Sequence, residues 1–240
     1  MLMTPHETDL IENERLTRRG SLLRLAGLAA AAGGAGARRL DSANAAGPLA
    51  VSSGLVRCVL TPELTEGPYY VAGEKLRRDV TEGKPGTSLL LNLTVVNAST
   101  CKAVKNASVE IWHCDAGGVY SGSVANNPGT NFLRGVQKTN AAGIATFKTI
   151  YPGFYQGRAV HIHVKVHVGG SVVHTGQLFF PASVTNVVYK RAPYSAHGTT
   201  PDTLNPNDSI FRNGGSKGLL TLKESGAGYV GSIGMGVHLA

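Results

Sequence analysis

The chain has 240 residues, of which 42% are hydrophobic and only 16% are charged. This length and apolar content suffice for one sizeable core, and the many glycines with few aromatic residues are typical of strands joined by tight turns. The net charge of +8 comes from scattered lysines and arginines. We find no nucleic-acid motif and no repeat of fixed period, so we expect no nucleic-acid partner.

The first 45 residues have the features of an export signal. Arg18 and Arg19 precede an Ala/Gly/Leu-rich stretch that runs to Ala37, and Ala43-Asn44-Ala45 matches a cleavage site of small residues. Paired arginines are typical of the twin-arginine route, and the apolar stretch is too short and glycine-rich for a permanent span. We expect residues 1–45 to be a twin-arginine signal peptide of an extracellular or cell-envelope protein, with no stable membrane span after cleavage. The alternatives are a basic leader or a membrane anchor.

Residues 46–57 are expected to be a linker, and residues 58–240 one domain. Strands separated by turn signals predict an all-β fold, a β-sandwich of two packed and mainly antiparallel sheets. Residues 61–70 are turn-rich and are expected to form an ordered loop. Residues 182–217 are polar and rich in Pro and Asn and are expected to form a long active-site loop. The expected strands lie at about 88–97, 109–113, 143–149, 159–168, 171–180 and 218–222.

The three cysteines all lie after the predicted signal peptide. An oxidising compartment favours one disulfide and one remaining thiol. Cys101 and Cys114 lie at opposite ends of a short strand and make a poor direct pair, so a bond from Cys58 to either of them is favoured. Three buried free thiols are the alternative.

The strand expected at 159–168 carries the most informative pattern. Apolar residues alternate with His161, His163, Lys165 and His167, so the first two histidines point the same way, roughly 7 Å apart along the strand. Two imidazoles at this spacing can bind one metal ion, and Tyr155 just upstream favours a hard, oxidised metal. A zinc or copper site is the next alternative. A third is the solvated face of an edge strand.

Four motifs in series resemble the intradiol ring-cleaving dioxygenases, in particular the β-subunit of protocatechuate 3,4-dioxygenase and its exported single-domain relatives. The resemblance covers about residues 58–215. The motifs are Thr65-Glu-Gly-Pro-Tyr-Tyr70, Ile111-Trp-His-x-Asp-Ala-x-Gly-x-Tyr-Ser121, Tyr151-Pro-Gly-x-Tyr155 and Gly157-Arg-x-Val-His-Ile-His163.

The resemblance implies one non-haem Fe(III) per chain and a reaction with O2. A catechol-type aromatic would be cleaved between its two hydroxyls to give a muconate-type diacid, with Tyr155 displaced by the substrate. Arg158 would stabilise negative charge on the ring, Gln177 would line the site, and Tyr69 or Tyr70 would line the substrate mouth. The implied metal ligands are Tyr120, Tyr155, His161 and His163.

The sequence departs from better-known members of the family in three ways. Arg-Ala-Val stands where Arg-Pro-Ala is common before the histidine pair, and only five residues separate Tyr155 from His161. These differences leave the choice among catechols open. The helical N-terminal region through which catechol 1,2-dioxygenases dimerise is missing, so the resemblance gives no expectation of oligomeric state.

Two other classes of function are also compatible with these residues. One is a transthyretin-like β-sandwich that binds ligands without turnover. The other is a zinc or copper hydrolase that uses His161 and His163. Colour would separate them from an iron enzyme, because phenolate-to-Fe(III) charge transfer absorbs visible light and zinc does not.

Overall fold

The computed structural model describes residues 59–122 and 129–239. The predicted signal peptide and linker lie outside these ranges, as does Cys58. No helix in the described ranges is long and apolar enough to cross a membrane. The described residues all belong to one unit, which extends over residues 41–240.

The first sheet has the strand order β4-β1-β8-β7. β1 (Ser88–Asn97) pairs antiparallel with β4 (Ile144–Ile150) and parallel with β8 (Gly228–Val237), which pairs antiparallel with β7 (Thr221–Ser225). Every second residue of β1 is buried and most of those between are partly exposed. This is the pattern of a strand with one apolar face.

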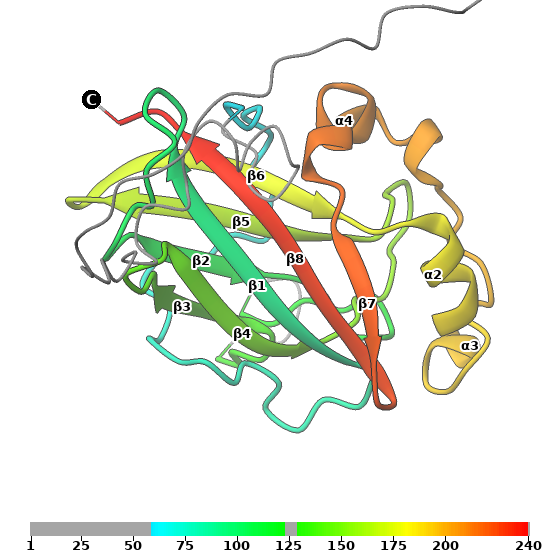
Figure 1. Ribbon diagram of the computed structural model, residues 1–240. Coiled ribbons are helices and arrows are strands. Elements are labelled where there is room, and N and C mark those ends of the chain that lie inside the picture. Colours follow the sequence, from blue (N-terminus) through cyan, green and yellow to red (C-terminus); the bar gives the residue numbers. More distant parts are fainter. Residues whose placement is uncertain (1–58, 123–128, 240) are drawn as a thin grey trace, which may run out of the picture. The chain divides into compact units, whose positions relative to one another are not determined.

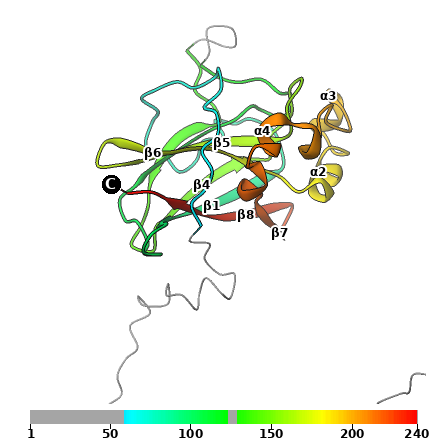
Figure 2. The same ribbon diagram turned by 90° about the horizontal axis from the view of Figure 1, so that it is seen from above.

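The second sheet has the order β3-β2-β5-β6, and all its neighbours are antiparallel. Its strands are β2 (Ser108–Trp112), β3 (Arg134–Lys138), β5 (His161–Val168) and β6 (Ser171–Phe179). Figures 1 and 2 show the two sheets as separate layers. Apolar side chains from both sheets form the core between them. The predicted all-β sandwich of mainly antiparallel sheets is therefore confirmed.

Short helices follow β6 and precede β7. They collect at one end of the two sheets, on the right of Figures 1 and 2. The prediction of a loop at 182–217 is wrong in this respect, because each helix has too few residues to show a helical period in the sequence. The helices are α2 (Ala182–Val188), α3 (Tyr194–His197) and α4 (Ser209–Arg212), with 3-10 turns η2 (Asn205–Asn207) and η3 (Gly215–Gly218).

The strand that carries the histidines is not an edge strand. β5 lies between β2 and β6, and its first six residues are buried on both faces. The interpretation of His161 and His163 as a solvated edge face is therefore wrong. Something must cover the outer face of this sheet.

The cysteines agree with one disulfide and one remaining thiol. Cys101 is disulfide-bonded. Cys114 is a free and buried thiol that donates to the Gly153 carbonyl at 3.4 Å. Burial, with the nearby Asp115 charge, raises the pKa of this thiol, so Cys114 stays protonated at neutral pH.

Candidate metal centre and active site

The strand register places three candidate side chains in one row across the second sheet. Trp112 of β2 lies opposite His163 of β5, and His163 lies opposite Gln177 of β6. All three are on the face away from the core, since the residues next to them in sequence belong to the core cluster. This row forms the floor of the candidate site.

Four of the predicted site residues come together at one end of that row. Tyr155 Oη lies 3.2 Å from His161 Nε2, and His161 Nε2 lies 3.0 Å from His163 Nε2. The Tyr120 ring is centred 5.6 Å from the Tyr155 ring and 6.1 Å from the His163 ring. We call these residues the Tyr/His cluster: Tyr120, Tyr155, His161 and His163.

The two histidines of the cluster are held as neutral imidazoles. His161 Nδ1 lies 2.6 Å from the Ala159 carbonyl; because a carbonyl only accepts, Nδ1 carries the proton and Nε2 keeps its lone pair. Burial, assisted by the charge of Arg158, lowers the pKa of His161 to about 3. Burial also lowers the pKa of His163. Bare Nε2 atoms are the form in which imidazole binds a metal.

The two tyrosines would be neutral phenols without a bound metal ion. Burial raises the pKa of Tyr155 to about 12, although Arg158 opposes the shift, and burial raises the pKa of Tyr120 further. The Tyr120 hydroxyl is buried and has no hydrogen-bond partner in the described ranges. A bound cation would satisfy that oxygen and would keep both phenols deprotonated.

The donor set of the cluster fits Fe(III) better than zinc. Two phenolates and two imidazoles offer two anionic oxygens to a hard ion. Within the described residues, no group of three or more His, Cys, Asp and Glu side chains could hold a metal. Structural zinc sites take Cys and His ligands, and catalytic ones add Asp or Glu, so the histidine pair lacks a third ligand of that kind here.

Residues 61–70 cover the outer face of the second sheet, and we call them the roof segment. Leu64 N donates to Thr175 O at 2.9 Å, and Glu63 contacts His174 and the Thr175 amide, both at 2.8 Å. Glu66 forms an ion pair with the buried Lys165. The contacts of Leu64 and Glu63 fix the segment to the terminal strand β6, and the pairing of Glu66 with Lys165 places it over the outer face of β5.

The roof segment touches the Tyr/His cluster directly. The Tyr69 ring stacks on Tyr120, with centroids 4.4 Å apart. Gly67 has φ +75°, and a Cβ at this position would lie 3.0 Å from His163 Cε1. His163 is thus enclosed between Gly67 and the Trp112 ring, which stacks on it at 4.9 Å. Only glycine gives both this backbone conformation and this close approach.

The two candidate mouth tyrosines have different surroundings. Tyr69 lies among the cluster, whereas Tyr70 packs on Trp112 and its hydroxyl donates to Glu110 at 3.4 Å. The Lys165 ammonium lies 3.5 Å above the Tyr70 ring. Burial, followed by the Glu110 charge, raises the pKa of Tyr70 to about 12. Of the two, Tyr69 is therefore the one that can meet a ligand at the cluster.

Arg158 and Gln177 lie beside the cluster and contact each other. Arg158 precedes β5 and is half-buried, so the parity of the strand does not constrain it. Its Nη1 lies 3.4 Å from Tyr155 Oη, and its Nη2 donates to Gln177 Oε1. Gln177 Nε2 donates to the Thr65 carbonyl of the roof segment at 2.9 Å. The guanidinium thus faces the more accessible of the two tyrosines.

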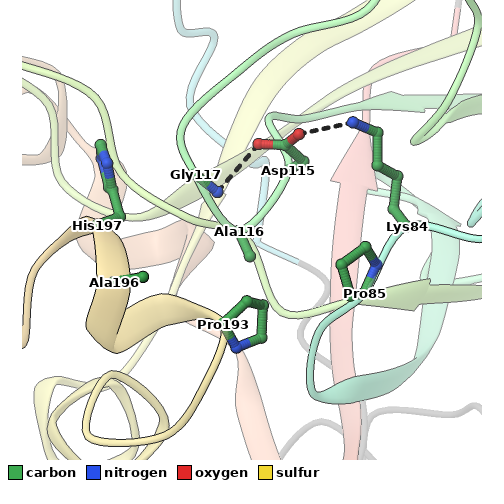
Figure 3. A pocket seen from close by; sticks show the side chains of 8 residues that line it. All are labelled: Lys84, Pro85, Asp115, Ala116, Gly117, Pro193, Ala196 and His197. Atoms are coloured by element: carbon green, nitrogen blue, oxygen red, sulfur yellow. Dashed lines mark hydrogen bonds and ion pairs between the residues drawn. The ribbon is translucent and has the colours of Figure 1, made fainter.

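Asp115 fixes the loop that presents Tyr120; Figure 3 shows its contacts with Gly117 and Lys84. Asp115 accepts from Gly117 N and Val119 N, each at 3.0 Å, and pairs with Lys84 at 2.8 Å. A surface pocket of about 370 Å³ borders this loop. None of the predicted site residues lines it; the lining residues are Lys84, Pro85, Asp115, Ala116, Gly117, Pro193, Ala196 and His197.

Tyr151 and three other histidines of the described residues lie apart from the cluster. Tyr151 hydrogen-bonds with Thr185 Oγ1 at 2.7 Å inside the core, which separates it from Tyr155. His113 is buried between Cys114 O and Thr149 Oγ1. His174 contacts Glu63, and His167 lies 3.4 Å from Glu110.

Sequence reasoning missed three residues of this site. Trp112 stacks on His163 on the outer face of the second sheet. Gly67 has the φ and the contact described above. Asp208 is buried and pairs with Arg158 at 2.9 Å. A glycine inside a tyrosine-rich motif was a usable signal, whereas nothing in the local sequence marks Asp208.

Comparison with known proteins agrees with this arrangement. A family model described as Dioxygenase matches residues 65–187, about half of the chain. The chain therefore belongs to the intradiol ring-cleaving dioxygenase family, as its four motifs indicated.

Three relatives illustrate the similarity. An intradiol ring-cleavage dioxygenase from Tetranychus urticae is 34% identical, with a TM-score of 0.71 over 75% of this chain and 95% of that one. The dioxygenase domain of a carbohydrate-binding fusion protein from Streptomyces sp. SirexAA-E is 30% identical, with a TM-score of 0.59 over 75% of this chain and 99% of that domain. Catechol 1,2-dioxygenase 1 from Acinetobacter lwoffii is 35% identical over 101 residues, which are 40% of this chain and 32% of that protein. The matched part thus spans about a third of that relative.

Proposed function

We propose that this protein is a non-haem Fe(III) dioxygenase that cleaves a catechol-type ring between its two hydroxyls with O2. The product would be a muconate-type diacid. The observation that carries the proposal is the convergence of the Tyr/His cluster, in which two imidazole Nε2 atoms and Tyr155 Oη lie within 3.2 Å of their neighbours. The names of the relatives support the same substrate class.

The cluster would hold one Fe(III) per chain. When bound, this ion would supply Lewis-acid chemistry, drawing electron density from a catecholate and making its ring reactive towards O2. Tyr120 and His163 are almost fully buried, so they are suited to remain in place. Tyr155 is only half-buried, so its Oη is the ligand oxygen that would be placed to accept a proton from an incoming catechol hydroxyl.

The remaining side chains bind and orient the aromatic ring. Arg158 carries a fixed positive charge 3.4 Å from Tyr155 Oη, where it can stabilise negative charge that develops on the ring. Gln177 holds one arm of this guanidinium. Tyr69 and the roof segment limit the access of water to the cluster, which strengthens every charge interaction inside it.

Metal content and colour test this proposal. The purified protein should contain about one iron per chain, absorb broadly in the visible and consume O2 with at least one member of a panel of catechol, protocatechuate, hydroxyquinol and lignin-derived diols. A colourless zinc protein would favour the hydrolase alternative. An iron protein that binds catechols without O2 uptake would favour a binding module.

We also propose that residues 1–45 direct export by the twin-arginine route. The support is the Arg18-Arg19 pair, the Ala/Gly/Leu-rich stretch and Ala43-Asn44-Ala45. This route carries folded proteins, which suits a metal inserted before export. Replacing both arginines by lysine should retain the precursor in the cytoplasm, as fractionation would show; unchanged secretion of the double variant would contradict the proposal.

A further inference from the structure

We propose that Asp208 is a positioning residue for Arg158, which it holds in the orientation that ring cleavage needs. This inference rests on the proposed function. Asp208 belongs to the segment between β6 and β7, fifty positions from Arg158 in the chain, and none of the four family motifs includes it.

The Asp208 carboxylate is itself immobile. Its side chain has no exposed surface. Oδ1 accepts from the amides of Ile210 and Phe211 at 2.7 and 3.0 Å and so caps α4. Oδ2 accepts from the Ala159 amide at 2.8 Å and from Arg158 Nε at 2.9 Å. Three backbone donors therefore fix the acceptor that receives the guanidinium.

The Arg158 guanidinium is consequently held on two sides. Its Nε donates a hydrogen bond to Asp208 Oδ2, and its Nη2 donates one to Gln177 Oε1. The amide of Gln177 is oriented in turn by the Thr65 carbonyl. Because Nε and Nη2 are both hydrogen-bonded, Nη1 is directed at Tyr155 Oη, 3.4 Å away. A planar fork fixed at two corners has little freedom to move its third.

Asp208 also offsets the charge of Arg158 next to a site for a cation. Arg158 Nη1 lies 3.4 Å from Tyr155 Oη, so its positive charge opposes a second cation at the Tyr/His cluster. A buried carboxylate 2.9 Å from Nε reduces that repulsion at the metal site while Nη1 still faces the substrate. Burial opposes ionisation of Asp208, but the hydrogen bonds from Ala159 and Phe211, together with the charge and hydrogen bond of Arg158, lower its pKa.

Asp208→Asn tests the inference, because it removes the charge and keeps a side chain of the same shape. We expect kcat to fall about 10- to 100-fold, the magnitude typical of groups that orient an active-site residue. KM and iron content should change less than about twofold. Asp208→Ser retains a good helix cap for α4 but cannot reach Arg158, so it should lose at least as much activity while the fold is kept. Either variant with wild-type kcat would overturn the proposal.

The matched control is Asp202→Asn. Asp202 is an exposed acid of the same segment that accepts from Gly157 N at 3.3 Å and does not contact the guanidinium. This variant should keep wild-type kcat. A loss equal to that of Asp208→Asn would mean that any acid of this segment acts through general charge or loop stability, and the specific role would fail.

A double-mutant cycle with Arg158→Ala separates positioning from a merely structural role. If Asp208 acts through Arg158, then Asp208→Asn should reduce kcat no further in the Arg158→Ala background. Additive losses would contradict the proposal.

One readout does not depend on turnover. In protein loaded with diamagnetic Ga(III), the Arg158 Nε–H NMR signal should exchange slowly in wild type and rapidly in Asp208→Asn. If wild type turns over no catechol but shows this contrast, the proposed function fails and the positioning contact stands. Rapid exchange in wild type would overturn the contact itself.

Discussion

The two sheets of the sandwich use their outer faces differently. In the first sheet, β1 alternates between buried and partly exposed residues, as a strand between core and solvent should. In the second sheet, β5 is buried on both faces for six residues, because the roof segment lies across it. The sheet that carries the candidate site thus differs from the first sheet in having the roof segment packed over its outer face.

The covered face demands partners that the open face does not need. Lys165 of β5 is 6% exposed and pairs with Glu66 of the roof segment. Lys148 of β4 is 59% exposed and pairs with Asp79 at 2.8 Å. A buried charge is costly unless it is paired. Lys165 therefore needs Glu66 as a partner, whereas the exposed Lys148 is also stabilised by hydration.

The largest expected effect lies at the covered face. Arg158→Ala should keep iron and colour but lose about two to three decades of kcat, roughly 3–4 kcal/mol of activation free energy. Arg158→Lys should recover little, since an ammonium cannot replace the planar fork. Steady-state O2 uptake and the visible spectrum measure both.

Two variants sharpen that result. Arg212→Ala removes an exposed arginine of α4 and should leave kcat unchanged. Tyr155→Phe removes a phenolate and should shift or bleach the colour. Loss of iron from Arg158→Ala, together with an unaltered spectrum in Tyr155→Phe, would show that the two roles have been assigned the wrong way round.

A pH-dependent effect is expected where the two sheets meet at His113. This residue follows β2, and its Nε2 contacts Thr149 Oγ1 of β4 at 2.7 Å. Burial lowers the pKa of His113 from 6.5 to about 4. In the unfolded chain this histidine binds a proton below about pH 6.5, whereas in the folded protein it does so only below about pH 4. The free energy of unfolding is therefore highest above pH 6.5 and falls as the pH is lowered from 6.5 to 4. The loss should be on the order of 3 kcal/mol.

Denaturant unfolding at pH 7.5 and pH 4.5 measures this loss in wild type and in His113→Gln, both with metal bound. The variant should be less stable than wild type at pH 7.5, and the difference should shrink in acid. His197→Gln, at an exposed histidine, is the control and should keep the wild-type pH dependence. An unchanged difference for His113→Gln would contradict the assignment.

The two lysines give the most direct comparison of the sheets and the smallest effects. Lys165→Met should cost about 2–3 kcal/mol of unfolding free energy, because it leaves Glu66 and the buried Glu110 without their cation. Lys148→Met should cost less than about 1 kcal/mol, and its effect should fade at high salt. Equal costs in denaturant titrations would mean that the roof segment does not exclude water from the sheet.

The sequence predicted the strands whose apolar alternation is clear, and it missed two that lack it. β8 contains several glycines because neighbouring backbone approaches it closely: a Cβ on Gly228 would lie 2.2 Å from Ser88 O of β1. Of the five residues of β3, only Val136 has a large apolar side chain, so no alternating pattern is visible. Both strands exist because of their neighbours in the sheet, and a local pattern does not contain that information.

The site shows the same division. His161, His163 and Tyr155 lie within nine positions, so their convergence follows from strand parity and one turn. Asp208 reaches Arg158 across fifty positions, and Trp112 reaches His163 only through the pairing of β2 with β5. Such contacts depend on strand order, which residue spacing alone does not give.

The roof segment has a consequence for the order in which the protein matures. It precedes every strand of the described residues, yet two of its anchors lie far along the chain: Thr61 bonds to Gly236 of β8, 175 positions away, and Glu63 bonds to His174 of β6, 111 positions away. A ribosome therefore releases this segment first, long before its anchoring strands exist. Contacts of such sequence separation form slowly, so the roof segment can cover the Tyr/His cluster only after β6 has been synthesised.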